Sequence, residues 1–162
     1  MLLVAGVLLA RALIGTDPGS GGSTDAGPLP LAAVVAPQAQ SPACSSLSAA
    51  LPATLASAGR TIDRLPLADP APAGAAAWGD RTRDPVVLRC GVQRPAELTP
   101  TAQLREISGV SWLPLTDSGA GATTWVLTGR AVFVALTVPD DAGTGPLQDL
   151  SAVVDTAVPV AP

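Results

Sequence analysis

The chain contains no histidine and no lysine, and these two absences exclude much familiar enzyme chemistry. Histidine is the commonest general base and also a common metal ligand. A serine nucleophile needs a neighbouring base, and neither histidine nor lysine is present to act as one. The sequence therefore excludes hydrolysis by a serine triad.

Positive charge is also sparse. All 9 basic residues are arginines, the net charge is −4, and no run of basic residues occurs. Attraction to phosphates dominates the affinity of proteins for nucleic acids, so we expect no nucleic-acid partner. Arginines gather loosely between residues 81 and 94, but acidic residues alternate with them. This pattern favours a mixed solvated surface over an anion site.

Ligands for metal ions are few. Zinc takes about four nitrogen or sulfur ligands, and the chain has only two cysteines, Cys44 and Cys90, without CxxC spacing. Asp140, Asp141 and Asp149 lack the spacing of a calcium-binding loop. We therefore expect no metal, no cofactor and no identifiable catalytic residue.

The composition indicates one domain with short regular elements. The chain has 162 residues, of which 48% are hydrophobic, enough for a single modest core. Its 16 glycines and 17 prolines require many connecting segments. Long helical bundles are therefore disfavoured.

The amino terminus, residues 1–15, begins with the apolar run MLLVAGVLLARALI, which only Arg11 interrupts. As a helix these 14 residues extend roughly 21 Å, less than the ~30 Å of a bilayer core. Three explanations fit: the hydrophobic part of a signal peptide, the end of a membrane anchor that starts upstream, or a buried helix. The missing cationic n-region favours the anchor.

Residues 16–42 have the composition of a linker, first rich in Gly and Ser and then in Pro and Ala. Glycine-rich chain is flexible, whereas proline favours extended backbone, so we expect a tether that stiffens toward the domain. The folded domain is then predicted over residues 43–159.

The domain begins with a helical pattern. Leu47, Leu51 and Leu55 recur every four residues, which predicts one face of a helix that is kinked at Pro52 and ends at Gly59. Strand-like runs cover residues 61–65, 85–90, 110–115, 123–128 and 131–138, a short helix is possible at 101–105, and a helical face spans 147–158.

We therefore predict an α+β fold. A largely antiparallel sheet of four or five strands is covered on one face by the broken amino-terminal helix and the carboxy-terminal helix.

The two cysteines have three possible roles: metal binding, redox chemistry or a structural disulfide. Cys90 ends a predicted central strand that faces the helix carrying Cys44. A disulfide is favoured if the domain is exported, because disulfides persist in oxidising compartments. Closing this loop in the unfolded chain predicts roughly 4 kcal/mol of stabilisation.

Three tryptophans offer large faces for packing or for ligands. Trp112 and Trp125 fall in strand-like runs and are expected in the core. Trp78 lies beside Asp80 in a loop-rich segment, where the tryptophan either covers the sheet or contacts a partner, and Asp80 is a further candidate contact. Arg89 should point away from the core, and with Arg130 it is a candidate anion contact, although a surface or structural salt bridge is favoured for both arginines.

An ordered set of short motifs resembles an actinobacterial family of small membrane-anchored or secreted envelope proteins, domain of unknown function 3515. The motifs are Ser41-Pro42-Ala43-Cys44, Ala50-Leu51-Pro52, Ala77-Trp78-Gly79-Asp80, Leu88-Arg89-Cys90-Gly91-Val92, Arg94-Pro95-Ala96, Gly109-Val110-Ser111-Trp112, Gly129-Arg130 and Val138-Pro139. The resemblance implies an amino-terminal membrane segment, an extracytoplasmic domain and a Cys44–Cys90 pair. It implies no activity.

These observations favour a noncatalytic module of the cell envelope. It is expected at the cell membrane on the extracytoplasmic side, or secreted if the amino terminus is cleaved, with an envelope protein or cell-wall component as its partner. Such a module should expose an apolar or aromatic patch. Two alternatives remain: a small envelope enzyme that uses two carboxylates, and a structural part of a larger assembly.

Overall fold

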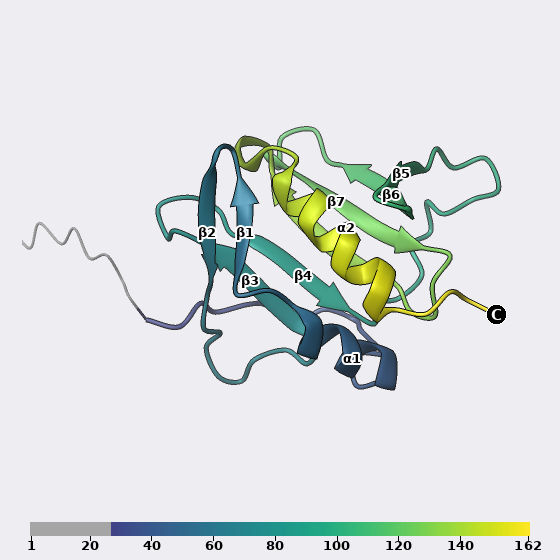
Figure 1. Cartoon of the computed structure of the whole chain (residues 1–162), viewed down its shortest axis with the longest axis horizontal. Helices are drawn as coiled ribbons and strands as arrows, with labels where there is room; N and C mark the ends of the chain where they lie inside the picture. Colours follow the sequence, from purple (N-terminus) through teal and green to yellow (C-terminus); the bar gives the residue numbers. More distant parts are fainter. Residues whose placement is uncertain (1–26) are drawn as a thin grey trace, which may run out of the picture.

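The computed structural model describes residues 27–162 (Figure 1). The predicted anchor over residues 1–15, and residues 16–26 of the predicted linker, lie outside the described residues. No helix within 27–162 is long and apolar enough to cross a membrane. The elements in chain order are α1 (Pro42–Ala50), β1 (Thr54–Ser57), β2 (Arg60–Arg64), β3 (Ala75–Gly79), β4 (Val86–Cys90), β5 (Arg105–Ile107), β6 (Val110–Thr116), β7 (Ala122–Thr128), β8 (Val134–Pro139), a 3-10 turn (Asp140–Ala142) and α2 (Gly145–Ala157).

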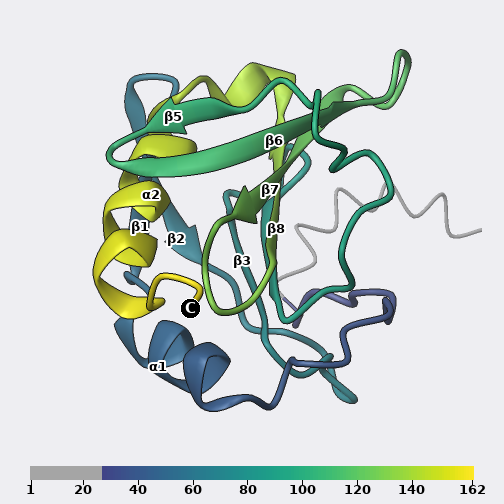
Figure 2. The same ribbon diagram turned by 90° about the vertical axis from the view of Figure 1, so that its right-hand side faces the viewer.

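The strands form one antiparallel sheet in the order β1-β2-β3-β4-β8-β7-β6-β5. The sheet twists strongly, so that β5 and β6 run across the direction of β3 and β8 in Figure 2. Both helices lie on the same face of the sheet (Figure 2), and α2 also packs against β1. The main core lies between this face and the helices.

The predicted sheet of four or five strands is wrong, because the sheet has eight. One reason is that the amino-terminal helix ends at Ala50 rather than continuing through Pro52. A residue before proline avoids helical backbone, and Leu51 accordingly is extended, with ψ 132°. Ala58 and Gly59 both have positive φ and form the turn of the β1–β2 hairpin, so Leu55 belongs to a strand.

Two further strands lie in segments that the sequence assigns to other structure. β3 falls within the predicted proline-broken excursion, and its run of three alanines gives little strand signal. Its pairing with β4, which sets Trp78 opposite Val86, fixes it as a strand. The possible helix at 101–105 is wrong, because residues 101–104 are not helical and β5 begins at Arg105. β5 turns into β6 through Ser108 and Gly109, both with positive φ.

The polar atoms of the core are paired. Trp112 is fully buried, and its indole N–H donates to the Ser151 hydroxyl oxygen at 2.9 Å. That hydroxyl in turn donates to the Leu147 carbonyl at 2.6 Å. This chain ties β6 to α2 without leaving an unsatisfied donor.

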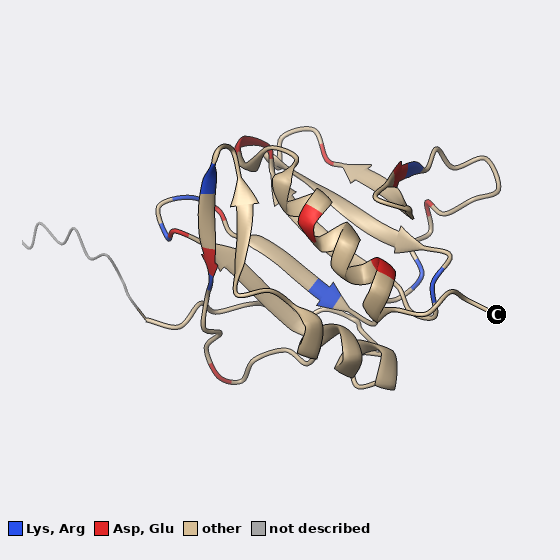
Figure 3. Ribbon diagram, in the orientation of Figure 1, with Lys and Arg blue, Asp and Glu red and all other residues tan. Residues whose placement is uncertain are grey.

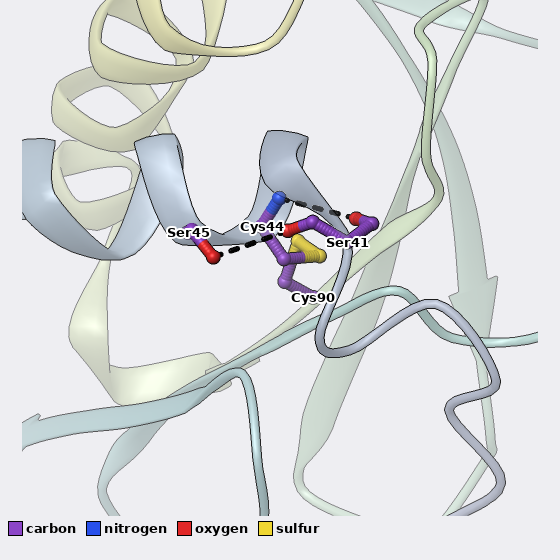
Figure 4. Close-up of a disulfide and its surroundings, with 4 residues drawn as sticks. All are labelled: Ser41, Cys44, Ser45 and Cys90. Carbon is purple, nitrogen blue, oxygen red and sulfur yellow. Dashed lines mark hydrogen bonds between the residues drawn. A yellow bond between two sulfur atoms is a disulfide. The ribbon is translucent and has the colours of Figure 1, made fainter.

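The predicted disulfide is confirmed (Figure 4). Ser41 caps α1, since its hydroxyl accepts from the Cys44 backbone N–H at 3.3 Å, and Cys44 therefore stands in the first turn. Cys90 ends β4, with its Cα 5.6 Å from that of Cys44. Both cysteines are buried, so the bond joins α1 to the centre of the sheet.

Candidate functional site

Trp78 lies in the core. Its exposed fraction is 0%, and its indole N–H donates to the Pro52 carbonyl at 3.0 Å. The Arg64 guanidinium lies over the ring, 5.8 Å from its centroid. The structure therefore leaves no face of Trp78 at the surface for a partner.

Asp80 organises the turn that follows β3. Its carboxylate pairs with Arg60 at 3.1 Å and accepts from the Thr82 hydroxyl at 2.8 Å and backbone N–H at 3.0 Å. The hydrogen bonds from Thr82 lower the pKa of Asp80 below its ordinary value. With Trp78, Asp80 borders a cavity of about 20 Å³, which has room for a single water molecule.

Arg130 stabilises the end of α2. It pairs with the Asp155 carboxylate at 2.5 Å and donates to the carbonyls of Asp155 and Val158 at 3.1 and 3.0 Å. A cation at these last carbonyls complements the helix dipole. Its terminal nitrogens are therefore already engaged with α2.

Arg89 lies on the opposite face of the sheet from the helices. It alternates with the buried Leu88 and Cys90 along β4, and burial lowers the pKa of its guanidinium. Atom Nη1 is shielded from solvent and has no hydrogen-bond partner within residues 27–162. The four predicted contact residues thus do not form one site, because only Trp78 and Asp80 are neighbours.

Charged residues are dispersed over the strands, loops and α2 (Figure 3). An open depression of about 590 Å³ collects several of them, but both signs are present and Arg83 pairs with Asp141 at 3.4 Å. Among the described residues, no group of His, Cys, Asp or Glu could hold a metal ion. The depression is lined by Arg81, Thr82, Arg83, Asp84, Gly121, Pro139, Asp140 and Asp141.

Residues 27–41, which we call the strap, lie against the domain before α1 begins. At one end the Leu29 backbone bonds to Pro66 and Ala68 at 2.7 and 2.8 Å. At the other end Gln38 N–H donates to the Gly91 carbonyl at 3.0 Å. The strap therefore connects the loop after β2 with the end of β4.

The strap carries an exposed apolar strip, residues 30–37, with the sequence PLAAVVAP. Val35 is 70% exposed and Val34 48% exposed. Beside the strip is a mostly apolar groove of about 430 Å³ between Pro30, Leu31, Ala33 and residues 68–72. The Pro- and Ala-rich composition predicted a linker here and not a surface, although eight consecutive uncharged residues were a visible signal.

The strap packs directly against Gly91, where no side chain fits. A Cβ at this position would overlap the Gln38–Ala39 peptide, and φ is +76°. Gly129 has a similar φ of +71° but nothing within 4 Å. We expect Gly91→Ala to cost about 2–3 kcal/mol and Gly129→Ala about 1 kcal/mol, since only the first adds a steric conflict to the backbone strain.

Urea denaturation measures both costs, and limited proteolysis within residues 27–41 reports release of the strap. Only Gly91→Ala should accelerate cleavage there. Equal stability and equal cleavage in the two variants would show that the strap is not seated on Gly91.

Comparison with known proteins gives a family but no activity. No curated protein and no solved structure matches the chain. One family model matches over residues 1–162, and its description is a protein of unknown function. The chain therefore belongs to the DUF3515 family.

Proposed function

We propose that this protein is a noncatalytic binding module of the cell envelope, tethered through its amino-terminal apolar segment, with its domain outside the cytoplasm. The observation that carries the proposal is the exposed apolar strip of residues 30–37. Contiguous apolar surface on a folded domain is typical of an interaction site.

The disulfide supports the proposed location. Cys44 and Cys90 are both buried and bonded, and no described cysteine is free. Such a bond persists in an oxidising compartment and is rare in the cytosol. The position of the strap agrees with a tether, because it leads directly from Gly27 to Ser41 at the start of α1.

The chemistry of the strip favours a protein partner. Residues 30–37 contain no arginine, so they lack the cationic residues that attract anionic lipid surfaces. They also contain no aromatic residue that could stack on a sugar. Valine, leucine and proline side chains instead suit an apolar surface on another protein.

Nothing in the described geometry favours the carboxylate enzyme. Every aspartate and glutamate within residues 27–162 is exposed or only partly buried. Carboxylates that act as general acids are usually raised in pKa by burial or by a close second carboxylate. The binding function is therefore the one we propose.

Site-specific photo-crosslinking tests the proposal in the cells that make the protein. A photoreactive residue at Val35 should capture a protein from the envelope fraction. Val160 provides a matched control, because it is 69% exposed but lies in the carboxy-terminal tail. We expect a discrete adduct at Val35 and none at Val160.

Two results would contradict the proposal. Identical adducts at both positions would indicate nonspecific capture, and no adduct at Val35 would leave the strip without a partner. The location is tested separately by alkylating the protein, isolated from the cells that make it, without a reductant. We expect neither Cys44 nor Cys90 to be alkylated. Two free thiols would remove the argument for export.

A further inference from the structure

The apolar groove beside the strap opens where a short parallel ladder stops. Leu29 N–H donates to the Pro66 carbonyl, and Ala68 N–H donates to the Leu29 carbonyl, which is the pairing of two parallel strands. The next rung of this ladder needs an N–H at residue 70, and Pro70 has none. The ladder therefore ends there, and a groove of about 430 Å³ lies between the strap and residues 68–72.

The strap backbone is extended and unpaired along this groove. Leu31 and Ala33 line the groove and Ala32 does not, as expected for an extended chain whose side chains alternate. None of the backbone–backbone hydrogen bonds within the described chain involves residues 31–34. Residues 32–34 are also exposed. An exposed, extended segment with unpaired N–H and carbonyl groups is a template for pairing with another extended chain.

The groove carries one negative charge. Asp69 is the only charged residue among the described residues that line it. Asp69 is exposed and takes part in none of the ion pairs within residues 27–162. The other lining side chains are those of leucine, alanine and proline, which have no hydrogen-bonding group. An occupant complementary to the groove is therefore apolar, with a positive charge placed at Asp69.

We propose that the groove binds an extended segment of a partner protein in which an apolar residue stands next to an arginine or lysine. The apolar side chain fills the groove, the segment's backbone pairs with residues 31–34, and its cation pairs with Asp69. An acyl chain lacks the N–H and carbonyl groups needed to pair with the strap, so the unpaired backbone favours a peptide. The proposal rests on the binding function proposed above and adds the chemistry of the partner to it.

Photo-crosslinking from inside the groove tests the proposal with the full chain in the cells that make it. A photoreactive residue replaces Ala71, which lines the groove and is exposed. Mass spectrometry then identifies the partner peptide that is attached. We expect the partner captured from Val35, attached through a segment with an arginine or lysine within about three residues of the crosslink, or ~10 Å of extended chain.

Substitution of Asp69 tests the charge. Asp69→Arg should lower the yield of the Ala71 adduct at least about tenfold, because like charges then face each other. Asp69→Asn should lower it about two- to fivefold, because only the ion pair is lost. Asp117→Arg is the matched control and should retain the full yield. Asp117 is also exposed and outside the ion pairs of the described chain, but it lies in the β6–β7 loop.

The proposal fails if the segment crosslinked at Ala71 has no basic residue, or if Asp69→Arg captures it as well as the chain with Asp69. It also fails if Val35 captures a partner and Ala71 captures none, and the binding function then still stands. No adduct at either position contradicts both proposals. Thermal unfolding shows whether each variant is folded. If Asp69→Arg does not fold, Asp69→Asn and the mapped segment decide the test.

Discussion

Replacing both Cys44 and Cys90 with alanine is expected to lower the free energy of unfolding by about 4 kcal/mol. The bond closes a loop across a sequence separation of 46 residues, and the loss of its constraint on the unfolded chain sets this magnitude. Small domains are typically stable by only about 5–15 kcal/mol, so the double variant should be marginal at physiological temperature. Urea denaturation followed by circular dichroism measures the difference.

The reduced wild-type protein is the control for the cysteine substitutions. It retains both sulfur atoms in the core but lacks the bond, so its stability should match that of the double alanine variant within about 1 kcal/mol. A double variant as stable as the oxidised wild type would show that the disulfide contributes nothing.

The disulfide also determines how the strap is held. Ser41 ends the strap and caps α1, while Cys44, in the first turn of α1, is bonded to Cys90 at the end of β4. Gly91, the next residue, accepts from the Gln38 N–H. The disulfide at Cys44 and the hydrogen bond at Gly91 thus hold α1 and the strap against the same end of β4. We therefore expect reduction of the disulfide to loosen the strap as well.

Sequence alone predicted five of the eight strands: β2, from a weak alternation over residues 61–65, and four with a strong local signal. β4, β6, β7 and β8 are rich in valine, leucine and threonine, and their alternation matches a sheet with one face against a core. The carboxy-terminal helix was predicted from its apolar spacing between two prolines, and α2 confirms it.

The missed elements depend on partners distant in the chain. The four-residue leucine spacing after Cys44 fits a helix, but Pro52 and the Ala58–Gly59 turn redirect the chain into a hairpin. The alanines of β3 form a strand only because β4 lies beside them. Sequence alone supplied the disulfide partners. It could not show that the strap packs against the loop after β2 and the end of β4, because these contacts join residues far apart in the chain.

For the candidate site too, the sequence predicted only what depends on residues close together in the chain. Alternation along β4 correctly placed Arg89 away from the helices, because that inference needs only local periodicity. Whether Nη1 has a partner depends on Ala75 and Ala135, which join Arg89 only through strand pairing. The position of Trp78 likewise depends on β3, so its loop-like sequence context gave no indication of burial.

Trp78→Ala should destabilise the protein by about 3–5 kcal/mol. Trp78 is fully buried, so truncation leaves a large cavity in the core and removes the hydrogen bond to the Pro52 carbonyl. Trp78→Phe should cost only about 1–2 kcal/mol, because it keeps most of the apolar volume and loses the indole donor. Equilibrium denaturation of both variants measures the two costs.

Trp125 is the matched control, since it lies in β7 and is only partly buried against the same core. Its replacement by alanine should cost clearly less than that of Trp78, because less apolar area is lost from the core. Crosslinking from Val35 distinguishes a packing role of Trp78 from a role in partner binding. If Trp78 only packs in the core, its replacement changes the Val35 adduct only when the domain unfolds. If Trp78→Ala stays folded yet abolishes the Val35 adduct, Trp78 belongs to the partner surface instead of the core.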